Sequence, residues 1–331
     1  MINQRLFDHY GIDTKKDLNI HKRCSRPFDT VLIDKMGSCY ACECTAWLPQ
    51  SMGNLHTKSL SDILKSVMAG QLRDSISDGS YRYCNQKQCM YLLDLSRVPW
   101  ENETPEQALK EIRLAIDDSC NLACPSCRTQ RVFIKKGKMM TMRLALMDRV
   151  VEYIRGHRGP LNIHIGSDGD PFASLVYRYF MRNVPTQHNL SYTFQTNGLL
   201  VKQMNGRVTH IFDRLKTLNL SIDGATAETY ELLRKGGQWE KIKENMQFIK
   251  DIKHKHGFNF HMHMVVQKDN WREMPHMLAL ARYYNADIVY FNPVQDWNTS
   301  PNFDNMRAPE ESDEFKKVLE QIKMDPIANA W

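Results

Sequence analysis

Six short segments after residue 110 alternate apolar and polar residues with the period of two that β-strands require. They begin at Glu111, Leu161, Ser191, Thr217, Asn259 and Asp287. Amphipathic stretches separate them, and the clearest carries Ile242, Met246 and Ile249 on one helical stripe. Alternating strands and helices imply parallel strands with right-handed crossovers. We therefore predict an α/β fold, a partial (β/α)6 barrel of the TIM type.

The second face of these strands is polar, which indicates a hydrophilic interior. Parallel strands that are covered on both faces are usually apolar throughout, and a closed barrel fills its centre with Val, Ile and Leu. Helices must cover the apolar face, so the polar face should line the interior. His164, His261 and His263 lie on it and are candidates for a substrate pocket. The alternatives are a half-solvated antiparallel sheet, and histidines whose hydrogen bonds are purely structural.

Glycine-containing loops follow the C-terminal ends of the predicted strands, where barrel enzymes place their chemistry. The second strand leads into residues 166–171, the third into 196–198 and the fourth into 221–224. Each loop by itself predicts only a tight turn. Together, at successive strand ends, they predict a ligand that the backbone approaches closely.

Composition narrows the function classes without choosing one. The 331 residues are 42% hydrophobic and 25% charged, which suits a globular chain of about two domains. No apolar run approaches the ~18 residues of a membrane helix, and the polar N-terminus lacks a secretory signal, so we expect a cytoplasmic protein without a membrane partner. The net charge of +6 is too modest to indicate nucleic-acid binding.

All nine cysteines lie in the first 127 residues. An odd number in a chain without signs of secretion favours metal or redox chemistry over disulfides. Cysteines that only fill a core would be scattered through the chain like other small apolar residues. They form two groups: Cys120, Cys124 and Cys127, and the earlier Cys24, Cys39, Cys42, Cys44, Cys84 and Cys89.

The later group has the spacing CxxxCxxC. Three thiolates can hold a cubane iron–sulfur cluster and leave one iron for an external ligand. Structural zinc, the main alternative, usually takes four ligands, and the next histidine after Cys127 is His157. The spacing resembles the signature of the radical S-adenosylmethionine (SAM) enzymes. Ser126 stands where that family often has an aromatic residue near the adenine.

This resemblance, which covers residues 110–295, implies further cofactor contacts. Gly169, Asp170 and Pro171 resemble the family's GGEP element, which holds the methionine amino group of SAM, with Asp in place of Glu. By the same analogy, further residues are candidates for the carboxylate, the ribose and a later contact: Asn197, Ser221, Asp223 and Gln267.

The N-terminal hundred residues are predicted to be irregular apart from one helix over 59–68, which begins at Ser59 with a capping pattern. A loop-rich module of this size usually needs a bound metal to stabilise its fold. Its cysteine spacing resembles the SPASM and twitch modules, which implies an auxiliary cluster held by Cys24, Cys42, Cys84 and Cys89. Cys39 and Cys44 are then spare, and either could replace Cys42. Zinc is the alternative metal.

We therefore expect an auxiliary-cluster module over 1–103, a radical SAM barrel over 104–300 and a helical tail over 301–331. The expected cofactors are two [4Fe-4S] clusters and SAM. The resemblance implies that SAM is cleaved reductively to a 5′-deoxyadenosyl radical, which abstracts hydrogen from a polar substrate such as a sugar, cyclitol or peptide.

Two outcomes fit an oxidoreductase or an epimerase. The substrate radical is oxidised with help from the auxiliary cluster, or it is inverted by hydrogen from a thiol such as Cys39 or Cys44. A small-molecule or peptide substrate and an electron donor such as flavodoxin or ferredoxin are the expected partners. RNA modification and a non-enzymatic iron–sulfur or zinc protein are the alternatives.

Overall fold

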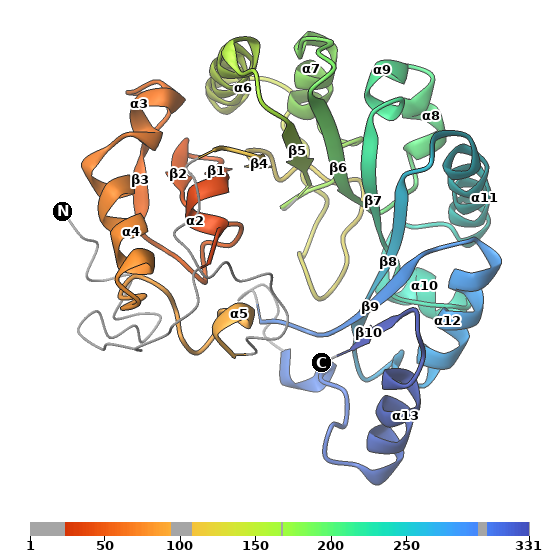
Figure 1. Cartoon of the computed structure of the whole chain (residues 1–331). Coiled ribbons are helices and arrows are strands. Elements are labelled where there is room, and N and C mark those ends of the chain that lie inside the picture. Colours follow the sequence, from red (N-terminus) through yellow and green to blue (C-terminus); the bar gives the residue numbers. More distant parts are fainter. Residues whose placement is uncertain (1–23, 94–107, 167, 297–302, 331) are drawn as a thin grey trace. The chain divides into compact units, whose positions relative to one another are not determined.

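The computed structural model describes residues 24–93, 108–166, 168–296 and 303–330 (Figure 1). Contacts divide these described residues into two compact units, the first from the ranges 1–117, 136–167 and 183–190, and the second from the ranges 118–135, 168–182 and 191–331. The predicted domain boundaries, at 103/104 and 300/301, lie outside the described residues.

The described residues of the first unit contain strands in the order β5-β4-β1-β2-β3. β4 pairs in parallel with both β5 and β1, whereas β1–β2 and β2–β3 are antiparallel. Its elements are α2 (Arg26–Asp29), β1 (Thr30–Asp34), β2 (Ser38–Tyr40), β3 (Ser51–Asn54), α3 (Leu60–Leu64), α4 (Val67–Ser77), α5 (Met90–Leu93), β4 (Glu111–Ala115), α6 (Lys138–Gly156) and β5 (Leu161–Ile165).

The second unit contains strands in the order β6-β7-β8-β9-β10, all parallel. Figure 1 shows its helices on the outer side of these strands. Its elements are α7 (Leu175–Asn183), β6 (Leu190–Thr196), α8 (Val201–Asn205), α9 (Thr209–Phe212), β7 (Leu215–Ser221), α10 (Ala227–Leu233), α11 (Trp239–His256), β8 (Asn259–Val266), η1 (Trp271–Glu273), α12 (Met274–Tyr283), β9 (Ile288–Pro293), η2 (Phe303–Met306), α13 (Asp313–Lys323) and β10 (Ala328–Ala330).

All six predicted strands are present, as β4 to β9, and the parallel pairing within each unit confirms the predicted α/β fold of the partial barrel type. The predicted alternation is also observed in the second unit. Leu218, Leu220 and Met262 are completely buried on the apolar face. On the other face, Asn219 is 8% exposed and His261 is partly exposed.

The N-terminal region is more regular than the sequence pattern predicts. Ser59 caps a helix as expected, with its Oγ accepting from the Asp62 N–H at 3.1 Å. The single helix predicted over 59–68 is, however, two helices. The Ser66 Oγ accepts from the Ala69 N–H at 3.2 Å and so begins α4. A serine in the middle of an apolar stripe can start a new helix because its hydroxyl satisfies a free N–H group.

Candidate active site

The later cysteine group lies on a tight loop of the second unit. The Cys120 N–H donates to the Val132 carbonyl at 2.8 Å, and the N–H of Cys127 donates to the Cys124 carbonyl at 2.9 Å. Cys120 and Cys124 are buried, whereas Cys127 is exposed. The last bond closes a turn that keeps Cys124 and Cys127 on one short segment, as the CxxC spacing requires.

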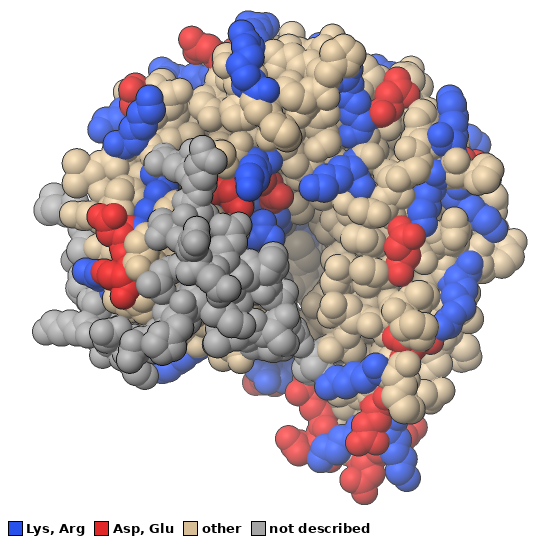
Figure 2. Space-filling view, in the orientation of Figure 1, with Lys and Arg blue, Asp and Glu red and all other residues tan. Residues whose placement is uncertain are grey.

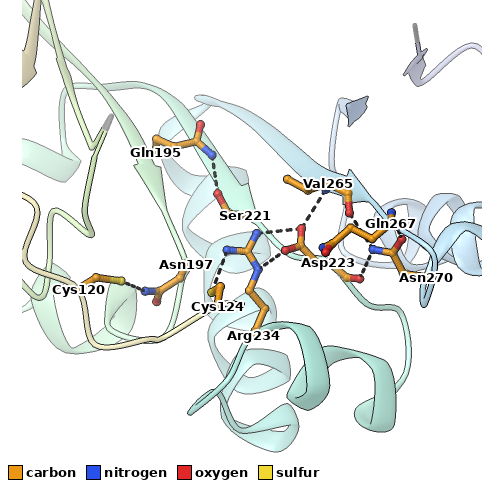
Figure 3. A network of polar contacts seen from close by, with 10 residues as sticks. All are labelled: Cys120, Cys124, Gln195, Asn197, Ser221, Asp223, Arg234, Val265, Gln267 and Asn270. Atoms are coloured by element: carbon orange, nitrogen blue, oxygen red, sulfur yellow. Dashed lines mark hydrogen bonds and ion pairs between the residues drawn. The ribbon is translucent and has the colours of Figure 1, made fainter. Parts of the chain in front are cut away.

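Two of the three thiols, those of Cys120 and Cys124, have a side-chain N–H donor at 3.8 Å. Asn197 Nδ2 lies 3.8 Å from the sulfur of Cys120, and Arg234 Nη1 lies 3.8 Å from the sulfur of Cys124 (Figure 3). The guanidinium of Arg128, which donates to the Asp118 and Asp168 carbonyls at 2.8 and 2.6 Å, lies near Cys127. Hydrogen-bond donors around sulfur stabilise negative charge on a thiolate, which is the form that ligates iron.

Burial works against ionisation of these thiols when nothing is bound to them. It raises the pKa of Cys120 to about 11, and it also raises the pKa of Cys124, where the charge of Arg234 opposes the rise. A metal centre that binds thiolate displaces the proton and offsets this cost. Three thiols on one loop, two of them with N–H donors at their sulfurs, therefore fit the predicted cluster.

The side chain of Asp223, just beyond the end of β7, makes three polar contacts with two residues. Its Oδ2 lies 2.9 Å from Nε of Arg234, and its Oδ1 accepts from Arg234 Nη2 at 3.0 Å and from the Val265 N–H at 2.9 Å. Burial raises the pKa of this carboxyl, and Arg234 opposes the rise. Arg234, which ends α10, was not identified from the sequence. A buried aspartate after a strand signals that some cation must face it, but the sequence does not say which.

Both carboxylate oxygens of Asp170 accept hydrogen bonds from the protein chain. Its Oδ1 accepts from the N–H groups of Phe172 and Ala173 at 3.0 Å, and its Oδ2 accepts from the Thr196 hydroxyl at 2.7 Å and the Asn197 N–H at 2.9 Å. The residue is 1% exposed, and burial raises its pKa. Asp170 therefore joins its own loop to the end of β6. Its predicted contact with the amino group of SAM stays a prediction, as do those of the half-buried Gly169 and the buried Pro171.

The remaining predicted cofactor residues lie in the same unit (Figure 3). The Asn197 amide also donates to Asn121 Oδ1 at 2.8 Å, and the Ser221 hydroxyl accepts from Gln195 Nε2 at 2.6 Å. Gln267 is 2% exposed, and its side-chain N–H group has no partner among the described residues. A buried donor without a partner costs free energy, so a ligand that accepts from Gln267 fits here.

The glycines at two strand ends have a packing role. Gly198 has a φ of +81°, and a Cβ there would meet Ile242 Cδ1 at 2.8 Å. A Cβ on Gly224 would lie 2.8 Å from the carbonyl carbon of Thr229, in the backbone of α10. The space beside each glycine is therefore filled by the chain itself.

His261 and His263 share one partner on the polar face of the second unit's strands. His261 Nδ1 lies 3.1 Å and His263 Nε2 lies 3.2 Å from the Asn219 Oδ1. Both nitrogens must carry the proton, because a carbonyl oxygen only accepts. Burial lowers the pKa of both histidines, that of His263 to about 3, so both are neutral at pH 7. His164 is buried on β5 of the first unit.

The N-terminal cysteines separate into two sets within the first unit. Four of them line one pocket together with apolar side chains: Cys24, Cys42, Cys84 and Cys89. Burial raises the pKa of Cys24 to about 12 and those of Cys42 and Cys84 well above the ordinary value. Among the described residues, no three His, Cys, Asp or Glu side chains are placed to hold a single metal ion. Four facing thiols nonetheless match the chemistry of a cluster site, so these four stay the predicted ligands.

The two spare cysteines do not line this pocket. Cys39 is completely buried on β2, with its sulfur 3.7 Å from the Gly37 carbonyl oxygen, and Cys44 is partly exposed. The proposed role of either as a hydrogen donor stays a prediction.

Comparison with known proteins decides the family. Residues 114–281, half of the chain, match the model of the radical SAM superfamily, and residues 24–90 match that of the SPASM iron–sulfur cluster-binding domain. The chain belongs to the radical SAM superfamily. Membership confirms the predicted family, its auxiliary module and its cofactors, the [4Fe-4S] clusters and SAM.

Curated relatives are similar over one part only. The chain is 26% identical over 148 residues to the GTP 3′,8-cyclase of Alkaliphilus metalliredigens, covering 44% of each chain. It is 24% identical over 148 residues to that of Peptoclostridium acidaminophilum, covering 43% of this chain and 42% of the relative. The chain thus spans less than half the length of these relatives.

Two solved structures of radical SAM enzymes are similar at lower sequence identity. AnSMEcpe with bound AdoMet is 19% identical, with a TM-score of 0.41 over 58% of this chain and 55% of that one. SuiB of Streptococcus suis bound to S-adenosylmethionine is 14% identical, with a TM-score of 0.46 over 67% and 49%. Within the described part of this radical SAM chain, no helix is both long and apolar enough to cross a membrane.

Proposed function

We propose that this radical SAM enzyme binds its SAM-cleaving cluster through Cys120, Cys124 and Cys127 and oxidises or epimerises a polar substrate. The observation that carries the proposal is the group of three thiols on one loop, with side-chain N–H donors 3.8 Å from the sulfurs of Cys120 and Cys124 and the Arg128 guanidinium near Cys127. When bound, the cluster and SAM supply the 5′-deoxyadenosyl radical that abstracts hydrogen from the substrate.

The chain's own residues orient these groups. Asn197 and Arg234 stabilise thiolate at Cys120 and Cys124, and the buried amide of Gln267 offers a free donor to the bound SAM. Asp170 and Asp223 hold the strand-end loops in place through bonds within the second unit. A site fixed in this way binds SAM without rearranging its own hydrogen bonds.

The interior histidines favour a substrate with hydroxyl or amide groups. Each neutral imidazole has one ring nitrogen that bonds Asn219 and a second that is left as an acceptor. Two acceptors on neighbouring positions of β8 suit the O–H or N–H groups of a sugar, cyclitol or peptide. The names of the relatives suggest two substrates to test. One is GTP, from the GTP 3′,8-cyclases, and the other is a peptide, from SuiB bound to precursor peptide SuiA.

The auxiliary cluster is proposed at Cys24, Cys42, Cys84 and Cys89. When bound, this cluster would supply an acceptor for the second electron of an oxidation, in which the substrate also releases a proton to solvent. In the other outcome, a thiol such as Cys39 or Cys44 would return a hydrogen atom to the substrate. The first is an oxidation and the second an epimerisation.

The test is reductive SAM cleavage by the anaerobically reconstituted enzyme, with dithionite, in D₂O. We expect about eight irons per chain and the formation of 5′-deoxyadenosine. Replacing Cys120, Cys124 and Cys127 together with alanine should halve the iron content and abolish the formation of 5′-deoxyadenosine. The control Cys39→Ala should leave the iron content unchanged. Unchanged iron in the triple variant would overturn the assignment.

The product distinguishes the two outcomes. Deuterium incorporated from solvent indicates epimerisation, and a product lighter by the mass of two hydrogens indicates oxidation. If the wild-type protein contains about four irons together with zinc, the N-terminal cysteines bind zinc and the auxiliary cluster has no part in the reaction.

A further inference from the structure

A surface cleft of the second unit reaches the residues beside the Cys120 thiol. Its volume is about 210 Å³, and its lining includes Ser119 and Asn121, the two chain neighbours of Cys120. Asn121 Oδ1 accepts from the Asn197 amide, whose nitrogen also contacts the sulfur of Cys120. The cleft therefore connects solvent to the immediate surroundings of the proposed SAM cluster.

Two large apolar side chains line this cleft and are open to solvent. Phe133 is 45% exposed and Leu175, at the start of α7, is 39% exposed. The Lys135 ammonium lies 5.4 Å from the centre of the Phe133 ring. Exposed apolar residues beside a polar cleft mark binding surfaces more often than exposed residues elsewhere do.

The surroundings of the cleft are basic. Lys135 and Arg178 are in its lining, which contains no acidic side chain among the residues that the structure describes. Leu175, Arg178 and Arg182 follow one another at helical spacing along α7, on the side opposite its buried residues. Burial lowers the pKa of Arg178, the charges of Arg207 and Arg182 add to this effect, and Asp170 opposes it. Asp170 is buried and bonded to the chain, so it presents little negative charge to solvent. Both Arg182 and Arg207 are exposed.

We propose that this cleft, with Phe133, Leu175, Arg178, Arg182 and Arg207 around it, docks an acidic electron-transfer protein. The inference rests on the proposed function, because that reaction consumes one electron at the cluster that Cys120 ligates. The docked donor, a reduced flavoprotein or iron–sulfur protein, loses that electron and the cluster gains it, with no atom transferred. Complementary charge speeds such encounters and exposed apolar side chains hold the pair together.

Nucleic acid is the other polyanion that a basic surface attracts. A single-strand surface offers several aromatic platforms along a basic groove, whereas Phe133 is the only aromatic residue in this lining within the described part of the chain. On the face drawn in Figure 2, Lys and Arg are dispersed among Asp and Glu. The position beside the cysteine loop further favours the electron donor.

The test uses the reconstituted enzyme and a reduced flavodoxin of negative net charge. The double variant Arg182→Glu/Arg207→Glu reverses two exposed charges, and stopped-flow absorbance follows reduction of the cluster. We expect the second-order rate constant to fall about tenfold or more at low salt and the difference to shrink at high salt. Phe133→Ala should slow the reaction at both salt concentrations.

The control Lys317→Glu/Lys323→Glu reverses two exposed charges on α13, which Figure 1 places at the other end of the unit from α7 and α8. We expect it to keep the wild-type rate constant. Dithionite should produce equal 5′-deoxyadenosine from all variants. If only flavodoxin-driven reduction fails in the double variant, the proposal holds.

An equal rate loss in the α13 control, or none in the double variant, would overturn the docking site. It is also overturned if the double variant loses salt-sensitive binding of a short single-stranded RNA but keeps its flavodoxin rate. Absence of 5′-deoxyadenosine in wild type with dithionite would instead contradict the proposed function, while the rate of cluster reduction would still test the docking site.

Discussion

Arg234 and Asp223 form a buried ion pair, with Arg234 Nε 2.9 Å from Asp223 Oδ2 and the two side chains 11% and 2% exposed. The same guanidinium reaches the sulfur of Cys124 at 3.8 Å. One cation thus serves a carboxylate and a proposed cluster ligand at once. This arrangement links the end of α10 to both the cysteine loop and the end of β7.

Loss of this cation should destabilise the metal-free protein strongly. We expect Arg234→Gln to lower the free energy of unfolding by about 3 to 5 kcal/mol, because Asp223 is left buried without its counter-charge. Adding Asp223→Asn should recover part of that loss, and urea unfolding of both single variants and the double variant measures the coupling. Strict additivity of the two losses would show that the pair does not interact.

Asp170→Asn tests whether that carboxylate acts within the chain. All four of its partners are donors, so an amide NH₂ must face at least one of them. We expect a loss of about 2 to 4 kcal/mol in the metal-free protein without SAM. The exposed Asp269→Asn is the matched control, with an expected change within about 0.5 kcal/mol. A stable Asp170→Asn protein that fails only to bind SAM would assign the carboxylate to the cofactor instead.

The auxiliary cluster can be tested through the two sets of N-terminal cysteines. Cys84→Ser should remove about four irons from the reconstituted protein, because Cys84 lines the pocket with the other three predicted ligands. Cys39→Ser and Cys44→Ser, outside the pocket lining, should leave the iron content unchanged. Iron analysis with electron paramagnetic resonance gives the number of irons and clusters per chain. If Cys44→Ser loses iron and the other variants do not, Cys44 is a cluster ligand and the predicted set of four is wrong.

Stability should fall as the pH falls below about 6.5, the ordinary pKa of histidine in the unfolded chain. The pKa of His263 is lowered to about 3 by burial, with the charges of His261 and Arg234 adding to the effect. The unfolded chain therefore binds the extra proton between these two pH values, and His263 contributes a slope of up to about 1.4 kcal/mol per pH unit.

His263→Asn should flatten this part of the stability profile, whereas replacement of the exposed His254 should leave it unchanged. Urea unfolding of the metal-free protein between pH 5.5 and 7.5 provides the measurement. A His263→Asn profile as steep as that of the wild type would mean that His263 titrates alike in both states.

Much of the fold was predictable because it depends on local patterns. The period-two alternation around Leu218–Leu220 and Met262–Met264 places side chains on opposite faces wherever the strand lies, and the structure buries these apolar residues. The sequence did not predict that the helix over 59–68 is divided in two. A serine such as Ser66 can either continue a helix or begin a new one, and its tertiary contacts determine which of the two occurs. The Ser66 hydroxyl also donates to the Met52 carbonyl, fourteen positions away in the chain.

The sequence by itself determined which chemical groups are present and how they are spaced: three thiols within eight residues, six more before them, and polar residues at successive strand ends. Only the tertiary structure decided which groups meet. It gathers Cys24, Cys42, Cys84 and Cys89 around one pocket and brings Arg234 to Cys124. Spacing along the chain restricts neighbours within a few residues, whereas partners dozens of residues apart are selected by packing and by the cost of leaving buried charge unpaired.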